Sequence, residues 1–394
     1  MEKLLLQNLF KRVKSGAFEV TYWDGTTEQY GESDPFIKVI FHEKIPYKQV
    51  VNNPVLTFGE AYMDGIIEFS GEMEQIFKVA NLEKVFLGQN RAGRILKTLS
   101  RLPQATSLRK QQEDVQYHYD LGNDFFSLWL DDTMSYSCAY FQNPEDTLTR
   151  AQIQKIDHVL KKLQLRSGET LLDIGSGWGW LIIRAAQEYG VKAMGITLSQ
   201  EQLKETRRRI AELGLQDKVE VELLDYRVLA EDGRTFDRIA SVGMFEHVGQ
   251  ANFPQFMLTI KKLLKEGGLT LLHTITHTKE NPVNSWVEKY IFPGGYIPSL
   301  REVIWLLPDY DFHVIDIESL RMHYAMTLDR WAEGFDKHVD KVREMYGERF
   351  VRMWRLYLRS GAASFRAGGL DVHQILFSNG LTNNLPLTRR LLYI

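Results

Sequence analysis

The chain has 394 residues, of which 44% are hydrophobic and 25% are charged, a balance typical of folded globular proteins and not of disordered ones. Its formal net charge of -3 argues against a general nucleic-acid-binding protein, so no nucleic-acid partner is expected. Its single cysteine, Cys138, excludes an internal disulfide framework and argues against a cysteine-rich metal site, so no metal is expected either.

The N-terminal part predicts a small mixed domain. Residues 1–14 predict a short amphipathic helix in which leucines and a phenylalanine oppose lysines and an arginine. The alternating residues 18–30, centred on Asp24-Gly25, predict a β-hairpin. Mixed strand and helix patterns follow, and they end in a helical stretch at residues 72–87. We therefore expect an α+β domain over residues 1–90.

A strongly basic stretch follows, with six basic residues and no acidic one between residues 91 and 110. The basic residues recur at helical spacing between apolar ones, which predicts a helical linker over this range. Such a helix suits an anionic phospholipid surface, although a solvated face or a contact between two subunits fits the pattern equally well. No apolar run is long enough for a secretion signal or a membrane-spanning helix, so we expect a cytoplasmic protein associated peripherally with the inner face of the membrane.

From about residue 150 the pattern changes to short apolar runs that alternate with helical segments. Such alternation predicts an α/β domain in which a parallel sheet has helices on both faces. The expected strands are residues 171–174, 193–196, 219–224, 238–242 and 269–276, and the expected helices are residues 178–189, 200–213 and 251–265. We assign residues 111–394 to this second domain.

The first of these strands runs into a glycine-rich loop, Gly-Ser-Gly-Trp-Gly at residues 175–179. Glycines permit a tight turn and a close approach of a ligand to the backbone, and Asp173 at the strand end can accept hydrogen bonds from a polar ligand. The spacing differs from the Gly-x-Gly-x-x-Gly of dinucleotide-binding enzymes, and the acidic residue expected about twenty positions later is absent. The second strand ends instead in Gly-Ile-Thr-Leu-Ser-Gln-Glu-Gln at residues 195–202.

This combination resembles a known family. Residues 171–179 resemble motif I of the class I S-adenosylmethionine-dependent methyltransferases, and residues 195–202 narrow the resemblance to the cyclopropane fatty acid synthases and their mycolic acid relatives. The resemblance covers roughly residues 110–394 and implies a Rossmann-like methyltransferase fold with a helical cover, and S-adenosylmethionine as the cofactor. The cofactor-binding residues that it implies are Tyr136, Ser137, Asp173, Gly175, Gly177, Gly179, Thr197, Gln202, Asp225, Tyr226 and Arg227.

The same resemblance implies a set of catalytic residues. The segment Tyr-Ser-Cys-Ala-Tyr-Phe at residues 136–141, the stretch at residues 241–249 and the pair His323-Tyr324 all match the family. In that family the base is a bound bicarbonate ion. The residues implied to hold it are Cys138, Glu246, His273, the backbone of Ile275, and Tyr324. Neutral donors can hold a small anion, and a carboxylate can accept its hydroxyl group.

Two of these residues also have ordinary structural interpretations. A lone cysteine is usually a small buried hydrophobe, and Cys138 is not expected to act as a nucleophile because direct methyl transfer to an alkene needs no covalent intermediate. His273, at a strand end after an apolar run, also fits a core histidine whose hydrogen bonds are satisfied. Residues 360–365, where some relatives carry a further cysteine, contain none here.

The implied reaction sets its own requirements. A cis alkene is a poor nucleophile and needs a strong electrophile such as a sulfonium methyl group. Transfer leaves a carbocation, which must lose a proton from the new methyl group as the ring closes. Aromatic faces stabilise a cation by about 2 kcal/mol or more when water is excluded. The candidates are Tyr140, Phe141, Tyr290, Phe292 and Tyr324.

We therefore expect a cyclopropane-fatty-acyl-phospholipid synthase that works as a homodimer on a phospholipid bilayer. The N-terminal domain is expected to assist lipid access, and residues 326–358 are expected to form two helices that roof an acyl tunnel. Two other functions stay open. One is a small-molecule N- or O-methyltransferase, because a fold does not fix a function. The other is a non-catalytic lipid-binding scaffold, which should have lost part of residues 173–179 or Glu246, whereas the sequence retains both.

Overall fold

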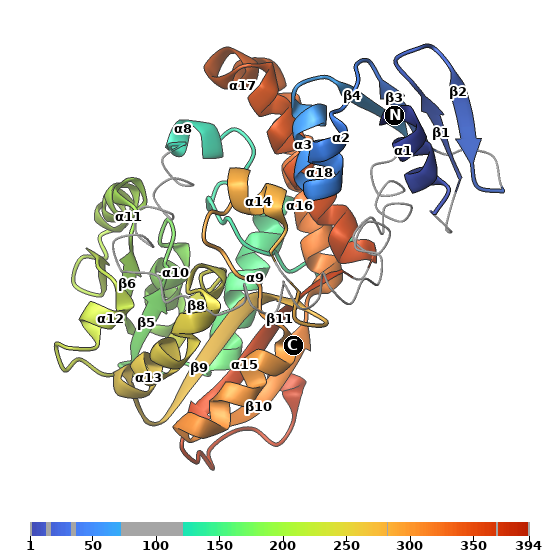
Figure 1. The fold of residues 1–394 in the computed structure, drawn as a ribbon. Helices are drawn as coiled ribbons and strands as arrows, with labels where there is room; N and C mark the ends of the chain where they lie inside the picture. The colour runs from blue at the N-terminus through green and yellow to red at the C-terminus, as the bar shows by residue number, and fades with distance from the viewer. Residues whose placement is uncertain are drawn as a thin grey trace. The chain divides into compact units, whose positions relative to one another are not determined.

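The computed structural model describes residues 2–12, 17–32, 37–71, 121–281, 283–367 and 369–392, and it divides into two units (Figure 1). Unit 1 consists of Met1–Gln104, Pro282–Pro293 and Trp331–Gly369, and unit 2 consists of Ala105–Asn281, Gly294–Arg330 and Leu370–Ile394. This division differs from the contiguous ranges 1–90, 91–110 and 111–394 expected above, because two later segments group with the N-terminal residues. The expected helix at 72–87 and the basic stretch at 91–110 lie outside the described residues.

Unit 1 contains a four-stranded sheet in the order β2-β1-β3-β4. The strands are β1 (Phe18–Thr21), β2 (Thr27–Tyr30), β3 (Ile37–Phe41) and β4 (Ile67–Gly71). β1 and β2 form the predicted hairpin, since they pair antiparallel with Thr21 opposite Thr27, and Gly25 in the connection has a φ of 79°. The Tyr22 N–H donates to the Thr26 carbonyl, so residues 23–25 form the connection. It is one residue longer than the connection of the tightest hairpins.

The N-terminal helix contributes to the core of unit 1. α1 (Glu2–Phe10) is shorter than the helix expected over residues 1–14, and its Leu6, Leu9 and Phe10 are buried. Phe10 packs edge-on against Phe18, with the ring centroids 5.5 Å apart. The apolar face of this amphipathic helix therefore packs inside unit 1.

The other helices of unit 1 come from three separate segments of the chain. They are α2 (Tyr47–Asn52), α3 (Pro54–Met63), α14 (Ser285–Tyr290), α17 (Val339–Tyr346), α18 (Glu348–Ala367) and the last residues of α16 (Arg321–Lys337). Residues 326–358 thus carry parts of three helices and not the two expected, because the chain also breaks at Gly347, whose φ is 83°. Trp331, Phe335 and Trp354 are buried, so these helices use large aromatic side chains for packing.

Unit 2 is built on a seven-stranded sheet in the order β10-β11-β9-β8-β5-β6-β7. Its strands are β5 (Thr170–Ile174), β6 (Lys192–Thr197), β7 (Val219–Leu223), β8 (Phe236–Val242), β9 (Leu264–His277), β10 (Phe312–Ser319) and β11 (Leu370–Asn379). The five expected strands are β5 to β9, and they pair in parallel as predicted. β10 and β11 were not predicted, and β11 pairs antiparallel with both β9 and β10, so the sheet is mixed at this edge.

Helices cover both faces of this sheet, as predicted (Figure 1). The helices that lie wholly in unit 2 are α8 (Asn123–Phe126), α9 (Leu148–Leu163), α10 (Trp180–Tyr189), α11 (Gln200–Glu212), α12 (Tyr226–Leu229), α13 (Phe253–Leu263) and α15 (Leu300–Leu306), with short 3-10 turns η1 (Phe245–His247), η2 (Gln250–Asn252), η3 (Leu307–Tyr310) and η4 (Arg389–Leu392). Successive strand residues point to opposite faces, so Leu171 packs in the buried cluster of α9 and α10, whereas Leu172 packs in that of α13.

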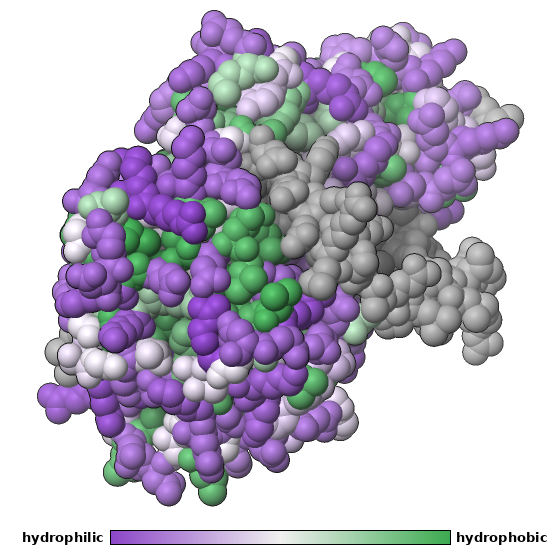
Figure 2. Space-filling model, turned by 90° about the vertical axis from the view of Figure 1, so that its left-hand side faces the viewer, coloured by the Kyte–Doolittle hydropathy of each residue, from purple (hydrophilic) through white to green (hydrophobic). Residues whose placement is uncertain are grey.

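The surface shown in Figure 2 is mostly hydrophilic, with hydrophobic residues gathered near its middle. Isolated apolar residues are ordinary on a protein surface, whereas a gathered group commonly marks a place where a ligand or partner binds. No helix within the described ranges has both the length and the apolar character needed to cross a bilayer.

Candidate active site

A pocket lies in unit 2 at the carboxyl ends of β5, β6, β7 and β8, the edge at which α/β sheets usually bind ligands. It is lined by residues that follow these strands and by the segment that precedes α9. All the expected cofactor-binding residues except Arg227 line it, namely Tyr136, Ser137, Asp173, Gly175, Gly177, Gly179, Thr197, Gln202, Asp225 and Tyr226. The structure therefore brings four separate sequence segments to one site.

Arg227 supports the pocket from behind its lining. Its Nε and Nη2 each donate to a carboxylate oxygen of Asp225 at 2.8 Å, and its guanidinium lies 5.1 Å from the centre of the Tyr226 ring. Arg227 thus orients two side chains that do line the pocket, and its direct contact with a ligand stays a prediction.

The glycine loop leaves no space for side chains at two of its positions. A Cβ added at Gly179 would lie 2.3 Å from Thr206 Cγ2, and one added at Gly175 would lie 2.8 Å from Met244 Cγ. At Gly177, which also lines the pocket, a Cβ would meet nothing within 4 Å. The backbone at Gly177 is therefore open to close approach by a ligand.

The polar lining of the pocket is rich in acceptors. The Asp173 carboxylate is buried, and its Oδ1 has no hydrogen-bond partner among the described residues. Burial raises the pKa of Asp173 to about 7, which the opposite charge of Lys155 partly offsets. The Thr197 hydroxyl donates to Gln202 Oε1 at 2.7 Å, which joins two of the expected cofactor-binding residues. A ligand with several hydroxyl and amino donors fits this lining.

Lys155 also lines the pocket, and sequence reasoning missed it. It lies on the buried face of α9, and its Nζ donates to Ser137 Oγ at 2.9 Å. Burial lowers its pKa to about 8. The signal was present in the sequence, because Lys155 interrupts the apolar stripe formed by Ala151, Ile156 and Val159, where a lysine is rarely placed without a partner.

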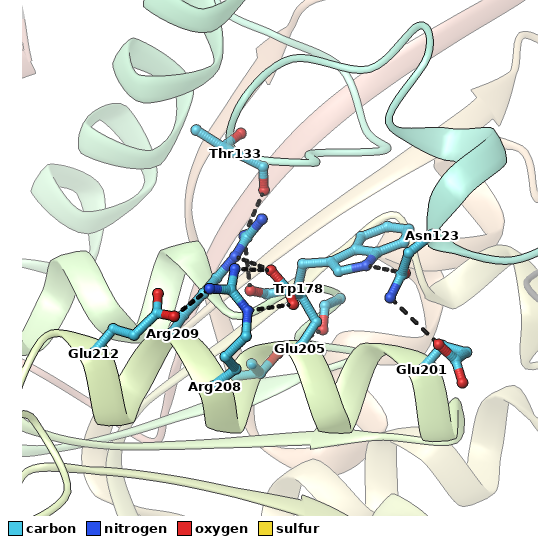
Figure 3. A network of polar contacts seen from close by, with 10 residues as sticks. Asn123, Thr133, Trp178, Glu201, Glu205, Arg208, Arg209 and Glu212 are labelled. Carbon is cyan, nitrogen blue, oxygen red and sulfur yellow. Dashed lines mark hydrogen bonds and ion pairs between the residues drawn. The ribbon is translucent and has the colours of Figure 1, made fainter.

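A polar network holds the walls of the pocket together (Figure 3). Arg209 on α11 donates through Nη1 to the Thr133 carbonyl at 3.1 Å and to the Trp178 carbonyl at 3.2 Å. The Trp178 indole N–H donates to Asn123 Oδ1 at 2.8 Å. Arg209 is itself held by Glu205, whose carboxylate also accepts from Arg208. α11 therefore ties the glycine loop to the segment before α9.

The expected catalytic residues lie around the ends of β9 and β11 in the same unit. Glu246 on η1 accepts through Oε1 from the Ile275 N–H at 2.6 Å. His273 accepts through Nδ1 from the Gln374 side-chain amide at 3.2 Å, and the two residues are paired across β9 and β11. Glu246 Oε2 and His273 Nε2 are buried and have no hydrogen-bond partner among the described residues. The described residues therefore satisfy only one of the two ring nitrogens of His273.

Cys138 and Tyr324 connect to this cluster through the backbone. The buried Cys138 thiol donates to the Leu320 carbonyl at 3.8 Å as well as to that of Ala139. The Leu320 N–H donates to the Val372 carbonyl, and Val372 pairs with Ile275. Tyr324 follows one helical turn later, since its N–H donates to the Leu320 carbonyl at 3.0 Å. All five expected catalytic residues are thus linked within one small region.

The cluster formed by Cys138, Glu246, His273, Ile275 and Tyr324 is joined to the pocket by a backbone hydrogen bond. Gly243 lines the pocket, and its N–H donates to the His273 carbonyl at 2.9 Å. Burial lowers the pKa of His273 to about 3, so its imidazole is neutral, and the bond to Nδ1 leaves the proton on Nε2. Burial raises the pKa of Glu246 and that of the Cys138 thiol, which keeps the thiol protonated. The cluster therefore offers neutral donors and one carboxylate beside the pocket.

The expected aromatic residues divide between the units. In unit 2, the Tyr140 ring stacks on His158 and on His323, with centroid separations of 4.2 and 4.8 Å. The Tyr140 face is thus occupied by the protein's own rings, which does not support the expected role beside a substrate cation. Tyr290 and Phe292 belong to unit 1, where the Tyr290 hydroxyl donates to Glu60 at 2.7 Å. Their role beside the reacting carbon stays a prediction.

Comparison with known proteins adds independent findings. Residues 106–375 match the family described as mycolic acid cyclopropane synthetase, and residues 5–91 match a domain of unknown function. A probable fatty acid methyltransferase of Pseudomonas putida is 39% identical over 94% of this chain and 95% of its own length. The cyclopropane-fatty-acyl-phospholipid synthase of Escherichia coli K12 is 38% identical over 87% of this chain and 88% of its own.

Solved structures agree with these matches. The cyclopropane synthase MmaA2 from Mycobacterium tuberculosis is 36% identical, with a TM-score of 0.64 over 71% of this chain and 99% of that one. Coclaurine N-methyltransferase superposes with a TM-score of 0.68 over 82% of this chain and 99% of its own, but it is only 22% identical, so it indicates the shared fold alone.

Proposed function

The chain belongs to the mycolic acid cyclopropane synthetase family, and we propose that it transfers a methylene group from S-adenosylmethionine to the cis double bond of a phospholipid acyl chain. The observation that carries this proposal is the position of the Glu246–His273 cluster. Glu246 Oε2 and His273 Nε2 are buried and have no hydrogen-bond partner among the described residues. Gly243, which lines the cofactor pocket, donates its N–H to the His273 carbonyl. A methyl acceptor that must also lose a proton needs both sites side by side.

The pocket fits the proposed cofactor. The unpartnered Oδ1 of Asp173 and the bare backbone at Gly177 suit a polar ligand that approaches closely. Thr197, Gln202 and Asp225 provide hydrogen-bonding groups for a ribose and an adenine. When bound, S-adenosylmethionine supplies an electrophilic methyl group on a sulfonium centre. The chain's own task is to hold this group in line with the alkene and to exclude water.

We also propose that the cluster binds bicarbonate. His273 Nε2–H is a neutral donor, and Glu246 Oε2 is an acceptor; neither has a hydrogen-bond partner among the described residues. The Glu246 carboxylate is held by the N–H of Ile275, two residues after His273 on β9. An ion that accepts from one and donates to the other satisfies both buried atoms, which otherwise cost free energy. Bound there, bicarbonate would serve as the base. Because the Cys138 thiol is buried and protonated, and its one proton is donated to backbone carbonyls, we assign it no nucleophilic role.

Removing bicarbonate tests the assignment of the base. A positioned base typically contributes about 10²–10⁴-fold to rate, so turnover in buffer stripped of carbon dioxide should fall and should recover when bicarbonate is restored. Glu246→Ala should lower turnover and blunt the recovery, because the ion loses its orienting acceptor. Glu280→Ala is the control, since Glu280 pairs with Arg301 elsewhere in unit 2. Full turnover in stripped buffer, with no ion retained on the enzyme, would show that a side chain is the base.

The substrate requires a membrane surface, because double bonds lie in the middle of phospholipid acyl chains. We propose that the protein docks peripherally on an anionic bilayer and works as a homodimer. The buried apolar face of α1 gives no support to docking through that helix. The proposal rests on the basic residues 91–110 and on the acyl chemistry. Incubating unsaturated vesicles with S-adenosylmethionine tests the function itself, with loss of alkene expected and an unchanged alkene count against it.

A further inference from the structure

We propose that Lys155 and Asp173 together recognise the amino-acid end of the cofactor, with Lys155 binding its carboxylate and Asp173 its ammonium group. This inference rests on the proposed function only in taking S-adenosylmethionine as the ligand. Lys155 would thereby select a cofactor whose amino-acid group is intact.

The first observation is the placement of Lys155. Its side chain lies on the buried face of α9 and lines the pocket, and its relative exposure is 4%. A buried ammonium group costs several kcal/mol unless it is paired. Its Nζ donates to a neutral hydroxyl, Ser137 Oγ, at 2.9 Å, and within the described ranges it forms no ion pair. The charges of Asp131 and Asp173 both act on this ammonium group, but neither carboxylate forms an ion pair with it among the described residues.

The second observation is the state of Asp173. Its relative exposure is 3%, it lines the same pocket, and its Oδ1 is buried without a hydrogen-bond partner among the described residues. Lys155 and Asp173 are close enough to influence each other's charge, yet they do not close into a salt bridge. Two opposite charges that line one pocket and stay apart leave room for a ligand group between them.

The chemistry of that group follows from the two charges. Burial moves both pKa values toward neutrality, to about 8 for Lys155 and to about 7 for Asp173. A ligand with a carboxylate and an ammonium group would give each residue an opposite charge and would stabilise both ionised forms. Ser137, which accepts from Lys155, still has a hydroxyl proton to donate to the carboxylate. An α-amino acid group meets all these requirements.

The test compares two ligands on variants of the full chain. S-Adenosylhomocysteine carries the amino-acid group, and 5′-methylthioadenosine shares the adenosine and the thioether but lacks that group. Lys155→Met should weaken S-adenosylhomocysteine by about 10- to 100-fold in calorimetry, the value of one or two charged hydrogen bonds, and should leave 5′-methylthioadenosine unchanged. Lys162→Met is the matched control, because Lys162 is a second buried lysine on α9 that pairs with Glu318 at 2.6 Å and does not line the pocket.

The outcomes separate the possibilities. Equal weakening of both ligands by Lys155→Met would give Lys155 a purely structural role, and no weakening of either would remove it from the site. Should this variant not fold, the unaltered protein still decides: decarboxylated S-adenosylhomocysteine should bind at least about tenfold more weakly than the intact ligand, and equal binding would overturn the proposal. These measurements use no lipid, so a failure of methylene transfer with the binding difference intact would count against the proposed function alone.

Discussion

At the scale of the residue, burial sets the protonation state of His273. Its imidazole is 1% exposed, and burial lowers its pKa to about 3, far below the ordinary value of 6.5. It therefore stays neutral at every pH at which the enzyme is expected to work. A neutral Nε2–H can hold an anion without competing as a base, and this is the role that the proposed reaction needs.

The same shift predicts a dependence of stability on pH. The pKa of His273 is lower in the folded state, so the unfolded chain binds more protons below about pH 6.5, and stability falls as the pH drops from there toward 3. One such group contributes a slope of about 1.4 kcal/mol per pH unit. In chemical denaturation, the wild-type protein should lose about 2 kcal/mol more than His273→Gln between about pH 6.5 and pH 5. His313→Gln, which alters an exposed histidine, should behave like the wild type. Parallel curves for His273→Gln and wild type would contradict the burial argument.

Asp173 and the glycine loop were predictable from the sequence, because a strand, a tight turn and a helix follow one another without a gap. Lys155 was not singled out, because its hydrogen-bond partner Ser137 lies 18 residues earlier and contacts it only in the folded chain. The stacking of Tyr140 on His158 and His323 could not be predicted either, because these neighbours come from helices that meet only in the folded chain.

At the scale of the element, α11 acts as the support of the pocket. One guanidinium, that of Arg209, joins the Thr133 and Trp178 carbonyls (Figure 3). These carbonyls belong to two pocket walls that are far apart in sequence. The neighbouring Arg208 makes ion pairs with Glu205 and Glu212 on the helix surface and touches neither wall.

This arrangement predicts unequal effects of two adjacent substitutions. Arg209→Met should weaken S-adenosylhomocysteine binding by about tenfold, because hydrogen bonds to a charged group contribute about 1.5–3 kcal/mol and their loss frees both walls. Arg208→Met should change affinity by less than about twofold, because exposed ion pairs contribute at most about 1 kcal/mol to stability and none directly to the site. Calorimetry measures both. Equal affinities for the two variants would mean that the network does not support the pocket.

The sheet illustrates which elements a sequence reveals. β5, β6, β8 and β9 contain short apolar runs, and β7 alternates apolar and acidic residues; all five alternate with helices, so their order and direction could be predicted. β10 alternates apolar residues with charged ones, and β11 pairs with β9 across about a hundred intervening residues, as with Val372 and Ile275. Such long-range antiparallel pairing has no local signal. It nevertheless matters for function, because β11 supplies Gln374 and thereby fixes the tautomer of His273.

At the scale of the whole molecule, the chemistry requires a methyl donor, a base and an acyl chain at one place. Unit 2 carries both the cofactor pocket and the cluster proposed to hold the base, joined through Gly243 and His273. The family match over residues 106–375 covers most of this unit. The transferred methyl group should therefore lose one hydrogen during the reaction, whereas simple methylation of nitrogen or oxygen retains all three.

The most direct measurement uses S-adenosylmethionine whose methyl group carries three deuterium atoms. After incubation with anionic vesicles of cis-unsaturated phospholipid, mass spectrometry should find CD2 added to the acyl chains, and those chains should no longer take up hydrogen on catalytic hydrogenation. Vesicles of saturated phospholipid should gain no label. Retention of all three deuterium atoms, on a head group, on a small amine or as a methyl branch, would contradict the proposed methylene transfer.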